Sequence, residues 1–260
     1  MASGPRDDPF ASPKRRLTRA KAKFKTFINR GKVFASKNPY ALVTEADPES
    51  GLEFYKFKIT KKLPLGMQDL AWEIVEELRS ALDQTGYACA VASGKVAPKN
   101  TYFPIADSAA QLETDVIGRG RCKDIPPNIV TLFRSFQPYK GGNDAIWALN
   151  RLANSNKHRF IIPAGGVAEQ SVGVNTLILP GGGSIHALRW DREKGEMIVL
   201  SAPIGSQIKY DLNFAVFVAF GEVEAVGGQP VAPILHAMIG EVDRILLATE
   251  AEARRLGLIR

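Results

Sequence analysis

The densest group of side chains that could bind a ligand or move a proton lies in residues 141–163. This stretch reads GGNDAIWALNRLANSNKHRFIIP, which is typical of a capped helix followed by the start of a strand. Amide and cationic side chains on one helix can hold a polar or anionic partner. The predicted binding residues are Asn150, Arg151, Asn154, Asn156, Lys157 and Arg159.

His158 is the candidate proton acceptor of this stretch. It stands between two cations, Lys157 and Arg159, and their charge favours the neutral imidazole that acts as a general base. The alternative is structural, because cations at the C-terminal end of a helix also meet its unpaired carbonyl groups. His158 is therefore a candidate catalytic residue, with helix capping as the competing interpretation.

Arg79 is the second candidate catalytic residue. It lies in the strongest predicted helix, residues 67–90, and an arginine can hold a phosphate or stabilise a developing negative charge. A structural explanation is again open, because Asp83 stands one turn later and Glu76 lies on the same helix. Either carboxylate could pair with Arg79.

No metal site or cofactor is predicted. His158, His186 and His236 are far apart in the sequence, and Cys89 and Cys122 have no ligand spacing. The three glycines at 181–183 are not followed by the Lys-Ser/Thr of a phosphate-binding loop, so they indicate a hairpin turn.

Two of these segments resemble an uncharacterised bacterial protein family. Residues 78–83 read LRSALD, residues 154–159 read NSNKHR, and a Phe-Pro-Ile segment lies between them at 103–105. Many similar chains carry a His directly after the Asp, which produces the Arg-x4-His signature of HEPN domains. These are helical bundles that often act as metal-independent ribonucleases.

The HEPN resemblance implies that Arg79 would contact an RNA phosphate while a base activates the 2′-hydroxyl group. Here the residue after Asp83 is Gln84, which cannot take up a proton at neutral pH. His158 would have to replace it, which requires the two helices to pack together.

Composition places the chain among ordinary globular proteins. It has 260 residues, of which 45% are hydrophobic and 23% charged. No apolar run reaches the roughly 20 residues of a membrane-spanning helix, and the first residues lack the apolar segment of a secretory signal. With only two cysteines, a cytoplasmic location is the simplest expectation.

The net charge of +7 is concentrated near the N-terminus. Of 34 basic residues eleven lie in residues 1–37, together with only two acidic ones. Residues 14–37 have apolar positions at helical spacing and predict a basic amphipathic helix. This helix could touch nucleic acid or a lipid surface, or it could dock its aromatic stripe on the body of the protein, which we favour.

The remaining pattern predicts an α+β fold: an N-terminal helical arm and hairpin, a helical bundle, then an antiparallel β-sheet with a C-terminal helix. Strands are expected at 40–44, 52–60, 172–179, 184–190, 196–202 and 214–224, and a final helix at 231–256. The predicted organisation is a disordered tail at 1–13, the basic helix at 14–37, hairpin plus bundle at 38–163, and sheet plus helix at 164–260. The last two could form one continuous domain.

Three functions are compatible with these features. The first is a non-catalytic module that binds an unknown protein or ligand through the polar residues of 150–159. The second is a HEPN-like metal-independent ribonuclease that uses Arg79 and His158. The third is RNA or DNA binding through the basic helix, without cleavage.

Overall fold

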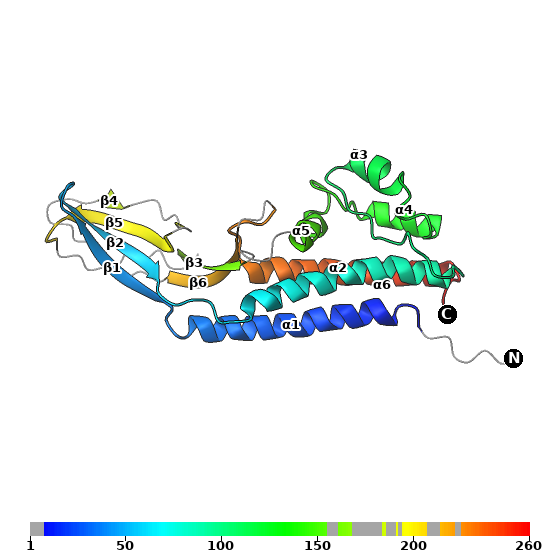
Figure 1. Cartoon of the computed structure of the whole chain (residues 1–260), viewed down its shortest axis with the longest axis horizontal. Coiled ribbons are helices and arrows are strands. Elements are labelled where there is room, and N and C mark those ends of the chain that lie inside the picture. Colours follow the sequence, from blue (N-terminus) through cyan, green and yellow to red (C-terminus); the bar gives the residue numbers. More distant parts are fainter. Residues whose placement is uncertain are drawn as a thin grey trace.

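The computed structural model describes residues 8–154, 161–167, 184–185, 191, 194–206, 214–221 and 225–260. The molecule is elongated, with helices at one end and a β-sheet at the other (Figure 1). The predicted α+β class is confirmed. Among the described residues no helix combines the length and the apolar character needed to cross a bilayer.

Three long helices form the helical end. They are α1 (Ala11–Ala35), α2 (Met67–Ala92) and α6 (Val231–Arg255), and they lie side by side (Figure 1). Each carries apolar residues at helical spacing, so each has one stripe to bury. The stripes meet in one core, which includes Leu17, Phe27, Ile74, Leu78, Leu235 and Val242.

Helix α1 begins earlier than the sequence suggested. Residues 8–13 were expected to belong to a disordered tail, but the helix starts at Ala11 and Phe10 is fully buried. Asp8 Oδ1 accepts a hydrogen bond from the Phe10 backbone N–H at 2.9 Å. Pro13 fits because it stands in the first helical turn, where a backbone N–H has no partner in the helix anyway. Residues 1–7 lie outside the described residues.

Both flanks of α1 are tied down by ion pairs. On one side Lys14 Nζ lies 2.8 Å from Glu250 of α6, and on the other Arg16 Nη1 lies 3.0 Å from Glu77 of α2. The aromatic stripe between these flanks is largely buried. The structure therefore supports the docked interpretation of α1, in which the stripe is core.

Glu77 should make the stability of the bundle decrease at acidic pH. Its burial raises its pKa, but the hydrogen bond and charge of Arg16 and the charge of Lys23 outweigh this, so the pKa lies below the usual 4.5. A carboxyl group with a lowered folded-state pKa stabilises the fold above its unfolded pKa and loses this contribution as pH falls through the folded value. We expect Glu77→Gln to cost about 1 kcal/mol at pH 7 and to lose less stability than wild type between pH 7 and pH 3, as measured by urea unfolding.

Glu113→Gln is the matched control for this experiment. Glu113 also pairs with an arginine, Arg134, but both side chains are well exposed. The change should cost at most about 0.5 kcal/mol and leave the acid profile unchanged. Identical acid profiles for the Glu77 variant and wild type would contradict the prediction.

A four-stranded antiparallel sheet forms the end of the molecule opposite the helices. The predicted hairpin is present as β1 (Tyr40–Asp47) and β2 (Leu52–Ile59). It continues into β5 (Glu196–Pro203) and the short β4 (Ser184–Ile185), in the order β1-β2-β5-β4. The strands β3 (Ile161–Val167) and β6 (Phe214–Phe220) pair separately. The strand expected at 172–179 lies outside the described residues, as do 186–190 and 222–224.

This sheet interleaves segments that the sequence assigned to consecutive blocks. The hairpin of block 38–163 pairs with β5 of block 164–260. The C-terminal helix α6 packs mainly with α1 and α2 rather than closing the sheet. Period-two and period-3.6 patterns show which face of an element is apolar, but not which distant element will cover it.

Shorter helices cover one side of α2. They are α3 (Ala109–Gln111), the π-helical turn η1 (Leu112–Ile117), α4 (Pro127–Ser135) and α5 (Asp144–Ala153). Local signals mark their starts: the side chains of Ser108 and Asn143 each accept a backbone N–H three residues later, and Pro127 stands in the first turn of α4. Helix α5 contacts both α2 and α6.

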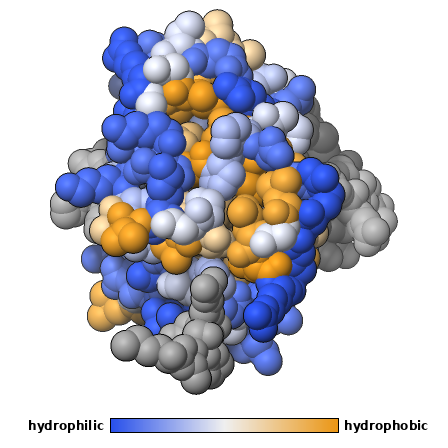
Figure 2. Space-filling model, turned by 90° about the vertical axis from the view of Figure 1, so that its right-hand side faces the viewer, coloured by the Kyte–Doolittle hydropathy of each residue, from blue (hydrophilic) through white to orange (hydrophobic). Residues whose placement is uncertain are grey.

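The core of the bundle reaches the surface at the end away from the sheet. The last turns of α2 and α6 leave Val91, Leu256 and Ile259 only partly covered. Figure 2 views this end and shows apolar surface at its centre, with hydrophilic side chains around it. This face is thus a mixed surface rather than a uniformly charged one.

Candidate functional site

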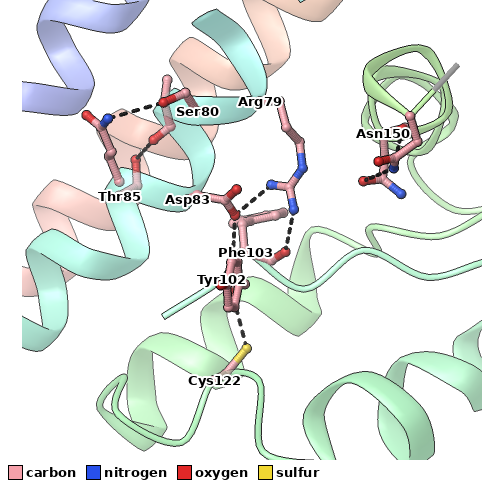
Figure 3. Close-up of polar contacts among 11 residues, drawn as sticks. Arg79, Ser80, Asp83, Thr85, Tyr102, Phe103, Cys122 and Asn150 are labelled. Atoms are coloured by element: carbon pink, nitrogen blue, oxygen red, sulfur yellow. Dashed lines mark hydrogen bonds and ion pairs between the residues drawn. The ribbon is translucent and has the colours of Figure 1, made fainter. Parts of the chain in front are cut away.

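A pocket lies between α2 and α5. It has a volume of about 370 Å³, within the usual range of ligand pockets. Helix α2 contributes Glu76, Arg79 and Asp83, and α5 contributes Asn150 and Asn154. Figure 3 shows Arg79 and Asp83 on the side of α2 that faces Asn150. The described lining comes from the helical half of the molecule.

Asp83 connects two other residues of the pocket lining through hydrogen bonds. Its Oδ1 accepts hydrogen bonds from Arg79 Nη1 at 2.7 Å and from the Phe103 backbone N–H at 2.9 Å. The Arg79–Asp83 pair along the helix, one of the sequence interpretations, is confirmed. Burial raises the pKa of Asp83, while the charge of Arg79 and the Phe103 N–H oppose the rise without cancelling it. Such perturbed carboxyl groups are common at functional sites.

Gly86 explains how Phe103 comes to lie beside Asp83. Helix α2, predicted to run over residues 67–90, continues past this glycine to Ala92. A Cβ atom at this position would come within 2.3 Å of the Thr101 carbonyl oxygen. The missing side chain therefore lets the backbone of residues 101–105 cross α2 one turn after Asp83.

The crossing segment is held from its other side as well. Cys122 Sγ donates to the Tyr102 carbonyl oxygen at 3.2 Å, and the Phe103 ring packs against Phe133 with centroids 4.7 Å apart. Arg79 Nη2 reaches the Phe103 carbonyl oxygen at 3.5 Å, a long contact (Figure 3). Arg79 is thus held in one orientation with part of its guanidinium group facing the pocket.

The predicted binding residues separate into two groups on α5. Asn150 and Asn154 line the pocket, and Asn154 Nδ2 donates to the Asn150 carbonyl oxygen at 2.9 Å. Arg151 instead lies 3.3 Å from Asp107 and 5.5 Å from the centre of the Trp147 ring. It ties α5 to the segment before α3, and its role in ligand binding stays a prediction. Asn156, Lys157 and Arg159 lie outside the described residues, as does the candidate base His158.

Gln84 points away from the pocket. Its Oε1 accepts from Ser12 Oγ of α1 at 2.7 Å, and its Nε2 donates to Ser80 Oγ at 3.1 Å. Five residues along an α-helix correspond to a rotation of about 140°, so Arg79 and Gln84 leave α2 in different directions.

Sequence reasoning missed two residues at the rim, Tyr102 and Arg121. Both are exposed, and among the described residues Arg121 makes no ion pair. Tyr102 belongs to a short extended segment, and Arg121 follows Gly118-Arg-Gly120. Neither position carries a periodic or motif signal, and both reach the pocket only through the tertiary packing of their segments.

The two cysteines are poor candidates for chemistry. Both are free and buried, and burial raises the pKa of Cys89 to about 12 and that of Cys122 to about 11. At neutral pH both stay thiols, whereas a nucleophile or metal ligand must be a thiolate. Within the described ranges, no three His, Cys, Asp or Glu side chains are grouped closely enough to hold a metal ion.

Comparison with known proteins provides no family. No family model matches the chain, and no curated protein and no solved structure matches it either. The argument for function therefore rests on the residues and geometry described above.

Proposed function

We propose that this protein is a non-catalytic binding module that holds a small anionic ligand in the pocket between α2 and α5. The observation that carries the proposal is the fixed Arg79–Asp83–Phe103 arrangement on the floor of a pocket with a polar rim. A preorganised polar floor loses little freedom when a ligand binds, which favours affinity. The cytoplasmic location expected from the sequence belongs to this proposal and is supported by two free thiols.

The charges of the rim indicate the kind of ligand. Arg121 and Arg79 offer guanidinium groups, which suit carboxylate or phosphate oxygens. Glu76 and Asp83 offer carboxylate oxygens, which suit N–H or O–H donors. A ligand that satisfies both carries an anionic group at one end and hydrogen-bond donors at the other, as a nucleoside monophosphate does.

Calorimetric titration with AMP and GMP tests this proposal. We expect saturable binding, weaker binding of the matching nucleosides without phosphate, and at least a tenfold loss in Arg121→Gln, because a charge-assisted contact is worth about 1.5–3 kcal/mol. Arg119→Gln is the matched control, since Arg119 is two residues away, also exposed to solvent and paired with Asp115. Equal affinity of wild type and Arg121→Gln, or no binding of either nucleotide, would reject the anionic ligand.

A ribonuclease remains the second candidate because of one observation. Arg79 faces the pocket, and Asn154, also in its lining, stands only four residues before His158. Four residues can span up to about 14 Å, so the chain length is compatible with His158 acting beside Arg79. The neighbouring Asp83 carboxyl group has a pKa that burial raises. Carboxyl groups with such shifted pKa values are also found at catalytic sites.

RNA cleavage in EDTA separates the two candidates. The binding proposal expects no cleavage above a mock purification. Cleavage that is lost in both Arg79→Ala and His158→Ala would replace it with a metal-independent ribonuclease. Equal cleavage by wild type and both variants would indicate a contaminant and leave the binding proposal standing.

A further inference from the structure

A second hollow lies on α1, on the other side of α2 from the pocket. Ser12, Arg15, Arg16 and Arg19 surround it, with a volume of about 210 Å³. Residues three and four apart lie on one face of a helix, so these four side chains converge. We call this group the arginine hollow.

Two of its arginines have charges that the described protein does not neutralise. Arg16 pairs with Glu77, and Ser12 donates to Gln84. Arg15 and Arg19 are exposed and have no ion pair with any described residue. Their basic neighbours on α1 differ, because Lys14, Lys21 and Lys23 each face a carboxylate of α2 or α6.

This unmatched pair is more than a solvated surface charge. Like charges at positions i and i+4 destabilise a helix, so an anion between Arg15 and Arg19 would remove a repulsion as well as add an attraction. Guanidinium groups also bind phosphate oxygens in a bidentate manner, and the hollow has room for a phosphate group between them.

We propose that the arginine hollow binds the backbone phosphates of a nucleic acid, independently of the pocket between α2 and α5. Insertion into a lipid surface is disfavoured, because the apolar stripe that would enter the membrane, including Leu17 and Phe27, is buried in the core. The described lining contains no aromatic side chain that could stack on a base. Binding is therefore independent of base sequence and strongly dependent on salt.

Fluorescence anisotropy with a labelled mixed-sequence 20-nucleotide RNA tests this site. The double variant Arg15→Gln/Arg19→Gln should bind at least tenfold more weakly at low salt. The slope of log K against log salt concentration should fall by about 1.4, because each phosphate contact on a single strand contributes about 0.7. The thermal midpoint should not fall, because neither arginine contributes an ion pair to the described fold and their mutual repulsion is removed.

Lys25→Gln/Lys32→Gln is the control. It removes the same charge from the same helix, at exposed lysines without a described ion pair. Its affinity should change less than threefold. Equal losses of RNA affinity in both double variants would show that only net charge matters and would contradict the proposed site. Unchanged affinity in the arginine variant, or no RNA binding by wild type, would contradict it as well.

Two further arms complete the test. Vesicles with 30% phosphatidylserine should not bind the protein, and vesicle binding without RNA binding would overturn the assignment to nucleic acid. The Arg15→Gln/Arg19→Gln variant should bind AMP and GMP as wild type does. This arm keeps the result separate from the proposed pocket, since either site can fail while the other holds.

Discussion

Phe27→Ala lowers the free energy of unfolding by about 3–5 kcal/mol, the usual cost of emptying a large buried aromatic position. Phe27 is almost completely buried, in the core that α1 shares with α2 and α6. If the aromatic stripe of α1 is structural, removing one of its rings leaves a cavity that the packed helices can fill only in part. Urea unfolding followed by circular dichroism measures the loss.

Val33→Ala is the control on the same helix. Val33 is 54% exposed, so its truncation should change stability by no more than about 0.5 kcal/mol. Deletion of residues 1–37 should abolish cooperative unfolding, because α2 and α6 would lose their shared partner. A truncated chain that still unfolds cooperatively with unchanged stability would show that α1 is an appended arm and not part of the core.

Asp83→Ala should have the second-largest effect, a loss of about 1–3 kcal/mol, because it leaves the Phe103 N–H and the Arg79 guanidinium group without their acceptor. The estimate stays below that for a fully buried ion pair because Asp83 and Arg79 are 32% and 20% exposed. Nucleotide binding should weaken together with stability, since the segment carrying Tyr102 would no longer be held against α2. Unfolding and calorimetric titration of the same variant test both.

Asp83→Asn separates the hydrogen bonds of Asp83 from its charge. Asparagine keeps an oxygen that can accept the Phe103 N–H, so it should cost less than alanine. Because the folded-state pKa of Asp83 is raised, the folded protein binds its proton more tightly than the unfolded chain does. The contribution of Asp83 to stability therefore falls as pH rises from its usual pKa of 3.8 through the folded value. The stability of the Asp83→Asn variant should not show this decrease as pH rises.

Asp115→Ala controls for the loss of a carboxylate. Asp115 also pairs with an arginine four residues away, but both side chains are largely exposed. This variant should remain within about 0.5 kcal/mol of wild type. If Asp83→Ala cost no more than Asp115→Ala, the Asp83 contacts would not hold the pocket together.

The individual elements were largely predictable because their signals are local. The stripe of Ile74, Leu78 and Leu82 specifies α2 through spacing alone, and Asn143 marks the start of α5 through its side chain. The Arg79–Asp83 pair is local in the same sense, since residues four apart on a helix are neighbours wherever the helix lies.

The pocket was only partly predictable because it is made of contacts between distant segments. Asn150 and Asn154 were predicted from their place on α5, and they do line the pocket. Arg151 lies between them in the sequence but turns toward Asp107, a direction set by the packing of α5. Tyr102 and Arg121 had no signal: Tyr102 reaches the rim where the chain crosses α2 at Gly86, and Arg121 lies in a loop that only the tertiary fold brings there.

The sequence by itself determined the α+β class, the apolar face of each long helix and the concentration of basic residues on α1. These properties depend on the period of the pattern and on composition, which involve only residues near each other in the chain. Only the tertiary structure decided that the β1–β2 hairpin joins β5, that α6 lies against α1 and α2, and that Arg15 and Arg19 have no ion pair with any described residue. Each of these depends on which elements pack against each other, and the pattern of residues within one element does not specify its distant partner.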